Sequence, residues 1–237
     1  MKRHLIRAVK RWGRSAGIEF ARYHPFLELI TARGATVVLD IGANVGQYAR
    51  ELRASGYRGR IVSFEPVAAC YQQLSAAAAS DPDWQAVHVG VGEANGESVI
   101  EVGRDTRMSS LLRSAAADSV ERRETIRLVD LHTAVAGHAT GKDRVFCKLD
   151  TQGYEMGILG AADEETLGRI DGFQIELAVT PTYLEQPTFE SVVSFLRERG
   201  FVLWTTRRGL YDPHLKRELE FDALFFRESP VSDGKPR

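Results

Sequence analysis

Short apolar runs along the chain alternate with segments in which apolar residues recur every three or four positions. The run Val37-Val38-Leu39 is typical of a strand buried on both faces, and Tyr48 and Leu52 then continue at helical spacing. This alternation predicts parallel strands joined by helices, the doubly wound α/β arrangement. The first expected elements are a strand ending at Asp40, a helix over 46–55, a strand ending at Glu65, a helix over 68–80 and a strand over 84–91.

The pattern changes after the third expected strand and then resumes. Asn95-Gly96 lies between short apolar runs and predicts a hairpin inserted over 90–100, and we expect the polar loop over 103–123 to cover the strand ends. The later expected elements are strands over 125–131, 144–150 and 172–177, helices from about 155 to 159 and over 188–199, and two antiparallel closing strands over 202–206 and 219–226.

The chain of 237 residues is long enough for one α/β domain with a full core. We expect a helical extension over 1–34, one domain over 35–228 and a flexible tail over 229–237. Residues 1–14 carry six Lys and Arg before any acid, with apolar residues on one helical stripe. A membrane-surface helix is one interpretation of this segment. We favour a helix that covers the sheet or a homo-oligomer interface.

Overall composition excludes several classes of protein. The 31 Lys and Arg residues balance 32 Asp and Glu residues, so charge gives no reason to expect a nucleic-acid partner. Cys70 and Cys147 are the only cysteines and make no disulfide framework, which indicates a reducing, cytoplasmic location. No apolar run approaches the roughly 18 residues that a membrane-spanning helix needs.

The turn after the first strand indicates a ligand. Asp40, Gly42 and Gly46 form an Asp-x-Gly-x-x-x-Gly pattern, which differs from the G-x-G-x-x-G of dinucleotide sites. Free N–H groups at a helix N-terminus suit a nucleotide-like ligand, and the carboxylate repels a pyrophosphate but attracts a sulfonium or an ammonium. We therefore expect S-adenosylmethionine, with the strand-end acid Glu65 placed for the ribose hydroxyls.

Acids end four of the expected strands, at Asp40, Glu65, Asp150 and Glu176. Such strand ends meet at one edge of the sheet, where α/β folds bind ligands. Methyl transfer to a hydroxyl needs positioning and one base. Asp150 is the candidate base and Glu176 the alternative or a substrate contact. The two carboxylates also suit Mg²⁺, but no ligand spacing indicates a dedicated metal site, and no spacing singles out a histidine such as His132.

Several segments resemble the FkbM-type S-adenosylmethionine-dependent methyltransferases. They are 38–48, Phe64-Glu65-Pro66, Ser109-Ser110-Leu111, 148–155 and 221–226, and the resemblance covers about Val37 to Phe226. The Lys-x-Asp-x-x-Gly-x-Glu motif over 148–155 is the most specific of them. The resemblance implies a Rossmann-like class I methyltransferase fold, with a mostly parallel sheet and an antiparallel C-terminal strand. It also implies O-methylation, often of sugar or polyketide hydroxyls. Gln152 stands where many members have Glu, so an acid is missing at that position.

The expected site follows from the turn, the strand ends and the loop. Expected cofactor contacts are Asp40, Gly42, Ala43, Asn44, Gly46, Gln47, Tyr48, Glu65, Pro66, Gly90 and Ser109. The expected acceptor is a hydroxyl of a sugar, a glycolipid or a secondary metabolite, and not a nucleic acid. One alternative is an NAD-type oxidoreductase, disfavoured by the missing G-x-G-x-x-G. The other is a non-catalytic binding module, disfavoured by the intact turn and the strand-end acids.

Overall fold

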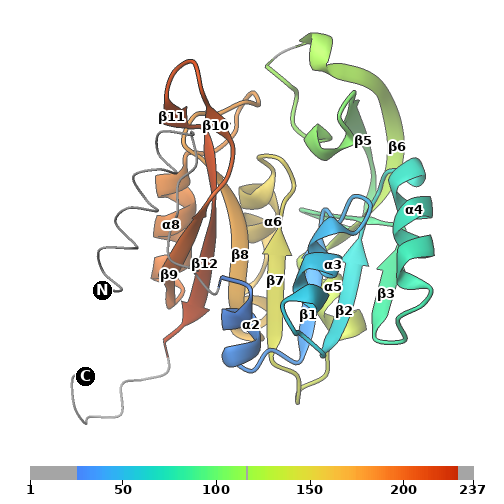
Figure 1. The fold of residues 1–237 in the computed structure, drawn as a ribbon, viewed down its shortest axis with the longest axis vertical. Helices are drawn as coiled ribbons and strands as arrows, with labels where there is room; N and C mark the ends of the chain where they lie inside the picture. The colour runs from blue at the N-terminus through green and yellow to red at the C-terminus, as the bar shows by residue number, and fades with distance from the viewer. Residues whose placement is uncertain (1–25, 116, 229–237) are drawn as a thin grey trace, which may run out of the picture.

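A seven-stranded sheet lies at the centre of the computed structural model, which describes residues 26–115 and 117–228 (Figure 1). The strand order is β3-β2-β1-β7-β8-β12-β9. The strands are β1 (Val37–Ile41), β2 (Arg60–Phe64), β3 (Trp84–Val87), β7 (Val145–Leu149), β8 (Ile170–Ala178), β9 (Phe201–Arg208) and β12 (Glu220–Arg227). The pairs from β3 to β8 are parallel, and β12 runs antiparallel to both its neighbours. The expected α/β class with an antiparallel C-terminal strand is confirmed.

Helices cover both faces of this sheet because its strands are apolar on both sides. Alternate residues of β1 point to opposite faces: Leu39 packs against one helical layer and Val38 against the other. The layer on the Val38 side contains α2 (Glu28–Ala32), α3 (Gln47–Ala54) and α4 (Ala68–Ala78). The layer on the Leu39 side contains α5 (Leu131–His138), α6 (Glu155–Ala161), α7 (Glu164–Gly168) and α8 (Phe189–Glu198).

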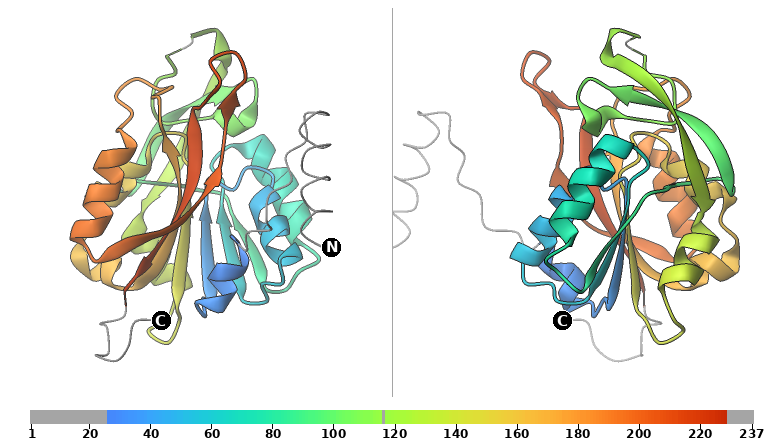
Figure 2. Two further views of the ribbon diagram at one scale, coloured as in Figure 1. Left: turned by 60° about the vertical axis from the view of Figure 1, so that its left-hand side comes forward. Right: turned by 90° about the vertical axis from the view of Figure 1, so that its right-hand side faces the viewer.

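A second, three-stranded sheet stands above the carboxyl ends of the central strands (Figure 2). It contains β4 (Gly90–Gly92), β5 (Gly96–Gly103) and β6 (Val120–Asp130) in the order β4-β6-β5. The expected hairpin over 90–100 is therefore wrong, since β4 and β5 each pair with an edge of β6 instead of with each other. The expected strand over 84–91 is divided: β3 ends at Val87, and the following residues join the second sheet.

The segment 104–119 connects β5 to β6 and is called the cover here. It contains the short 3₁₀ turns Thr106–Met108 and Ala117–Ser119, and it ends earlier than the expected loop because β6 begins at Val120. A small hairpin of β10 (Tyr211–Asp212) and β11 (Arg217–Glu218) between β9 and β12 was not expected.

Several sequence predictions lie wholly or partly outside the described residues. These are the basic helix over 1–14 and the tail over 229–237. Of the helical extension expected over 1–34, the described part contains only α2. The limits of the domain, 35 and 228, stay a prediction. Among the described residues, no helix is long and apolar enough to cross a membrane.

Candidate active site

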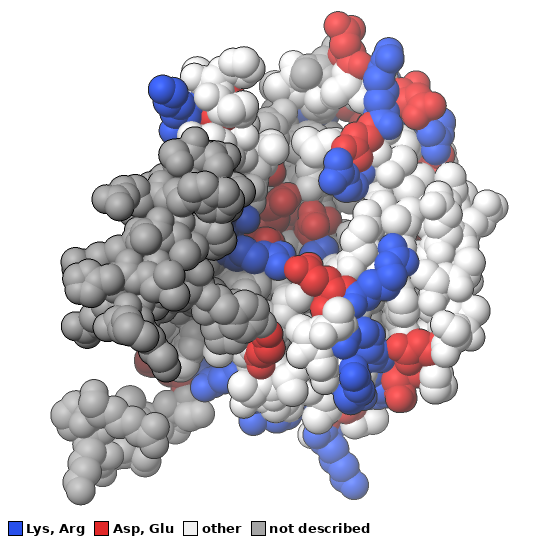
Figure 3. Space-filling view, viewed as in Figure 1, with Lys and Arg blue, Asp and Glu red and all other residues white. Residues whose placement is uncertain are grey.

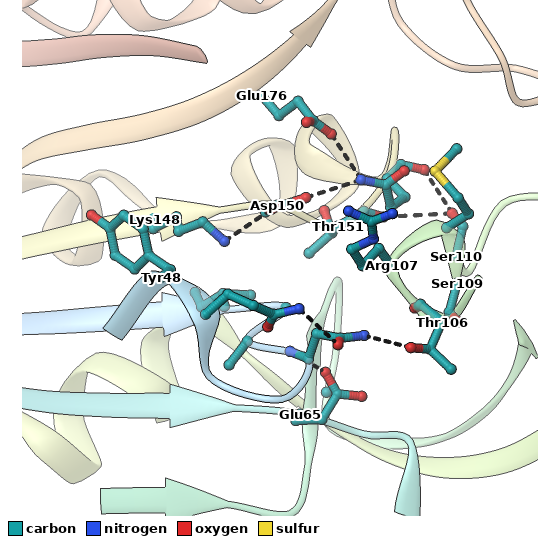
Figure 4. Close-up of a pocket in the computed structure, with 18 of the residues that line it drawn as sticks. Tyr48, Glu65, Thr106, Arg107, Ser109, Ser110, Lys148, Asp150, Thr151 and Glu176 are labelled. Carbon is teal, nitrogen blue, oxygen red and sulfur yellow. Dashed lines mark hydrogen bonds and ion pairs between the residues drawn. The ribbon is translucent and has the colours of Figure 1, made fainter. Parts of the chain in front are cut away.

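A cavity of about 590 Å³ opens at the carboxyl edge of the central sheet. Figure 3 shows acidic side chains at the bottom of a hollow on this face. In Figure 4, Glu65 lies at one end of the cavity and Glu176 at the other, with Asp150 between them. The cavity is lined by the turn after β1, the ends of β2, β7, β8, β9 and β12, and the cover. Its volume is within the range of small-molecule sites, about 300–1,000 Å³.

Most of the predicted site residues line this cavity. They are Gly42, Ala43, Asn44, Gln47, Tyr48, Glu65, Pro66, Gly90, Ser109, Asp150 and Glu176. Asp40 and Gly46 do not line it. Gly46 has a φ of +83° at the start of α3, and a Cβ there would collide with Trp84, so packing alone explains this glycine.

Gly42 keeps two strand ends close together. Its φ is +80°, and a Cβ at this position would collide with the main-chain carbonyl oxygen of Asp150. The N–H groups of Gly42 and Ala43 both donate to the carbonyl oxygen of Phe64, at 3.1 and 3.0 Å. The turn after β1 is thus joined to the ends of β2 and β7, the two strands that carry Glu65 and Asp150.

Asp40 is fully buried and makes its contacts inside the protein. Its Oδ2 accepts a hydrogen bond from Ser63 Oγ at 2.9 Å, and Ser63 accepts one from Trp84 Nε1 at 3.0 Å. Lys148 Nζ lies 3.5 Å from Asp40 Oδ1. Burial raises the pKa of Asp40, while Lys148 and Ser63 lower it. The carboxylate thus contacts a lysine that itself lines the cavity, and its expected contact with the cofactor stays a prediction.

Glu65 is held rigidly by main-chain donors. Its Oε2 accepts from the N–H of Asn44 and its Oε1 from the N–H of Val67, both at 2.8 Å. Burial raises the pKa of Glu65 to about 7, although both N–H donors lower it. The carboxylate lines the cavity and keeps lone pairs free for hydroxyl donors.

Asn44 connects the first turn to the cover. Its φ of +49° is left-handed, and its Nδ2 donates to Thr106 Oγ1 of the cover at 3.1 Å. Ser109 Oγ donates to the carbonyl oxygen of Thr106 at 2.8 Å and accepts from Gly103 N, so this serine shapes the turn of the cover. Ser110 Oγ donates to the carbonyl oxygen of Gln152 at 2.8 Å. The cover is therefore hydrogen-bonded to the turn after β1 through Thr106 and to the segment after β7 through Ser110.

Gln152 joins the two candidate catalytic acids. Its Nε2 donates to Asp150 Oδ1 at 3.0 Å and to Glu176 Oε2 at 2.8 Å. The other oxygen of Asp150 accepts from Lys148 Nζ at 2.9 Å, and the Asp150 side chain is 31% exposed, so a ligand can reach it. Burial, followed by the negative charges of Asp150 and Glu220, raises the pKa of Glu176 to about 9. Glu176 therefore holds a proton near neutral pH.

Further lining residues were missed by sequence reasoning. Those that come from β8, β9 and β12 are Gln174, Arg207, Glu220 and Asp222. Gln174 Nε2 donates to Asp222 Oδ1 at 3.0 Å, and Arg207 lies 3.0 Å from Asp222 Oδ2. The polar interruption of the apolar strand at Asp222 was the only signal available. His132 does not line the cavity, because its Nδ1 lies 3.0 Å from Thr166 Oγ1 on another face.

A metal site is not indicated by this geometry. Among residues 26–115 and 117–228, no group of three or more His, Cys, Asp or Glu side chains is arranged to hold a metal ion. Three carboxylates of the cavity, Asp150, Glu176 and Asp222, instead meet the side-chain donors of Lys148, Gln152, Gln174 and Arg207.

Comparisons with known proteins identify the family and the fold of the chain. The family described as "Methyltransferase FkbM domain" matches residues 40–203. An rRNA methylase from Streptococcus thermophilus has a similar fold, with a TM-score of 0.50 and 9% identity over 89% of this chain and 100% of that one. The magnesium protoporphyrin IX methyltransferase of Synechocystis PCC 6803 with bound SAM has a TM-score of 0.45 and 12% identity, over 93% of this chain and 91% of that one. No curated protein matches the chain.

Proposed function

Because this chain belongs to the FkbM methyltransferase family and is an S-adenosylmethionine-dependent enzyme, we propose that it methylates a hydroxyl oxygen of a sugar, a glycolipid or a secondary metabolite. The observation that carries the proposal is the pair of carboxylates, Asp150 and Glu176, joined by Gln152 in the middle of the cavity. A hydroxyl needs a base to become a nucleophile, and this pair supplies one.

The residues at the Glu65 end fit the cofactor. S-adenosylmethionine, when bound, supplies an electrophilic methyl group on a positively charged sulfur. The Glu65 carboxylate, fixed by two N–H donors, suits the ribose hydroxyls. Tyr48 also lines the cavity, and its ring lies against Lys148, with 4.9 Å between the ring centroid and Nζ. Gly42, Ala43 and Asn44 complete this wall.

Asp150 and Glu176 divide the acid–base work. Lys148 and Gln152 orient the Asp150 carboxylate, and each of its oxygens keeps a free lone pair that can take the hydroxyl proton. Because its raised pKa keeps Glu176 protonated, Glu176 serves as a hydrogen-bond donor to the acceptor. The acidic lining disfavours a phosphate-rich acceptor, so we propose a small-molecule or glycan acceptor and no nucleic acid.

The test is methyl transfer from radiolabelled S-adenosylmethionine to fractionated glycans, glycolipids and hydroxylated metabolites. We expect a labelled methyl ether, formed by the unchanged enzyme and by the control Asp83→Asn at an exposed acid, and strongly reduced with Asp150→Asn. A labelled methyl group found only on nitrogen, carbon or nucleic acid would overturn the O-methylation proposal.

We also propose a cytoplasmic location, with peripheral membrane contact or homo-oligomer formation through residues 1–14. The basic residues of that segment support vesicle binding that weakens with salt. Deletion of residues 1–14 distinguishes the two roles: loss of sedimentation with anionic vesicles supports membrane contact, whereas a smaller assembly in light scattering supports an interface.

A further inference from the structure

The end of the cavity far from Glu65 is strongly acidic. Asp150, which follows β7, and Glu176, which lies near the end of β8, line it (Figure 4). Glu220 and Asp222, at the start of β12, line it too. Several carboxylates close together are costly unless they meet cations or hydrogen-bond donors. The question is therefore which groups neutralise them.

The cations of this region are already shared between acids. Lys148 lies between Asp40 and Asp150, at 3.5 and 2.9 Å. Arg207 lies between Glu51 and Asp222, both at 3.0 Å. Each cation thus serves two carboxylates. Within the part of the chain that the structure describes, neither cation pairs with Glu176 or Glu220, so these two acids have no cation beside them.

Glu220 is the carboxylate with the fewest contacts. Only 6% of it is exposed, it lines the cavity, and its side chain has no hydrogen-bond or ion-pair partner among the described residues. Burial and the charges of Asp150 and Asp222 raise its pKa. This buried carboxyl group therefore lacks the cation or hydrogen-bond donor that would offset the cost of its burial.

Gln174 provides a second, independent observation. It is 1% exposed and lines the same end of the cavity, and its Oε1 has no hydrogen-bond partner among the described residues. Its orientation is set by chemistry, since Asp222 can only accept and therefore requires the Nε2 of Gln174. A buried, unpaired amide oxygen beside acids calls for a ligand that donates hydrogen bonds.

We infer that this acidic end (Gln174, Glu176, Glu220 and Asp222) binds a protonated amine of the acceptor, which is therefore an amino alcohol such as an amino sugar or an aminocyclitol. An ammonium offers three donors and a positive charge, which match two carboxylates and an amide oxygen. A metal ion fits less well, since no metal-type cluster exists among the described residues. The inference rests on the proposed O-methylation and specifies its acceptor.

The ammonium also directs the methyl group to oxygen. A protonated amine has no lone pair, so the neighbouring hydroxyl is the available nucleophile. The O–CH₃ bond forms as the C–S bond breaks, the electron pair of the C–S bond stays on sulfur, and the hydroxyl proton passes to Asp150. The products are a methyl ether, S-adenosylhomocysteine and a proton.

Calorimetry on the full chain saturated with S-adenosylhomocysteine tests the inference. The probes are neamine, an amine-rich aminoglycoside, and its fully N-acetylated derivative, which is uncharged. We expect neamine to bind about 10- to 100-fold more tightly than the acetylated form, the worth of one charge-assisted hydrogen bond. Glu220→Gln should remove most of this preference without changing the affinity for S-adenosylhomocysteine. Glu228→Gln, at an exposed acid just beyond β12, is the control and should keep the preference.

Each contrary outcome has a distinct meaning. Equal binding of the two probes, or no binding of neamine up to its solubility limit, overturns the amine site and leaves the O-methylation proposal intact. Loss of S-adenosylhomocysteine affinity in Glu220→Gln assigns the acid to the cofactor and also overturns it. An amine preference that depends on Glu220, in an enzyme that forms no methyl ether with any acceptor, would overturn the O-methylation proposal alone.

Discussion

Lys148 links the acid of the first turn to the candidate base. Its ammonium lies between Asp40 and Asp150, and its side chain is only 8% exposed. The Tyr48 ring is close by, with its centroid 4.9 Å from Lys148 Nζ. Through this lysine, the buried Asp40 carboxylate is connected to Asp150.

The first prediction concerns Asp40→Ala. Removal of this carboxylate leaves the buried Lys148 and Ser63 short of a partner, so the free energy of unfolding should fall by about 1–3 kcal/mol. Urea unfolding followed by circular dichroism measures the loss, with Asp83→Ala at an exposed position as the control. Unchanged stability with abolished cofactor binding would instead return Asp40 to the cofactor site.

The second prediction concerns Asp150→Asn, which preserves the shape of the side chain and removes its basicity. The turnover rate should fall by roughly 10²–10⁴, and the loss should be smaller for acceptors with more acidic hydroxyls. Affinity for S-adenosylhomocysteine should change little, because Glu65 and the first turn form the other end of the cavity. Near-normal turnover would rule out Asp150 as the base and leave Glu176 as the candidate.

The position of three acids was predictable from the sequence, because each follows or ends an apolar run and the carboxyl ends of parallel strands meet at one edge. These acids are Glu65, Asp150 and Glu176. The buried state of Asp40 was not predictable, since its role depends on Lys148, which stands more than a hundred residues later in the chain. Glu220 was also missed: it begins a strand that runs antiparallel to its neighbours, so its first residue, not its last, reaches the carboxyl edge.

At the scale of elements, the cover is held by side chains from separate parts of the chain. Ser110 donates to the carbonyl oxygen of Gln152, and the Tyr183 hydroxyl lies 2.9 Å from the carbonyl oxygen of Met108. The N–H of Leu184 donates to the main-chain carbonyl oxygen of Arg113, which adds a hydrogen bond between main chains. These bonds close the cavity on the side opposite the sheet.

The third prediction follows from these ties. Ser110→Ala removes one of them, so trypsin should cut after Arg107, whose side chain is 69% exposed, about fivefold faster than in the unchanged protein. S-adenosylhomocysteine should slow the cut in both proteins. Ser191→Ala, which loses a comparable hydroxyl bond on α8, should leave the rate unaltered. An equal rate in Ser110→Ala would mean that this bond does not hold the cover.

Pairing between elements was the least predictable part of the fold. Apolar spacing locates strands but does not say which sheet each joins, so 84–91 was expected as one strand although it contributes to two sheets. The hairpin expected at Asn95-Gly96 failed for the same reason: β6 has eleven residues and two free edges, and it pairs with both candidate partners. Short helices such as α7, with five residues, lack the length for a clear periodic pattern.

At the scale of the whole molecule, buried acids make stability depend on pH. Burial raises the pKa of Glu155 to about 7 from 4.5, and that of Glu65 to about 7. Between these values the folded state binds more protons than the unfolded state, so the contribution of these two acids to stability is full below pH about 4.5 and is lost as the pH rises through about 7. The acid at position 176, with a pKa of about 9, extends the decline.

The fourth prediction is a melting temperature that falls steadily from pH 5 to pH 9. Glu155→Gln should flatten the part of this fall below pH about 7, because its amide oxygen still accepts from the N–H groups of Thr151 and Gly153 and carries no charge. Differential scanning calorimetry at several pH values measures the slope, with exposed Glu97→Gln as the control. A slope that is identical in the Glu155 variant would assign the pH dependence elsewhere.

The two ends of the segment that forms most of the second sheet lie next to each other. Gly92 on β4 pairs with Asp130 on β6, and Asn95 exchanges two hydrogen bonds with Asp130, so residues 93–129 leave and re-enter the fold side by side. This stretch, which contains the cover, is therefore a cassette in the engineering sense. A relative's version can be exchanged between two adjacent anchor points without a new linker, and the cover can then be replaced while the strands of the central sheet remain those of the parent.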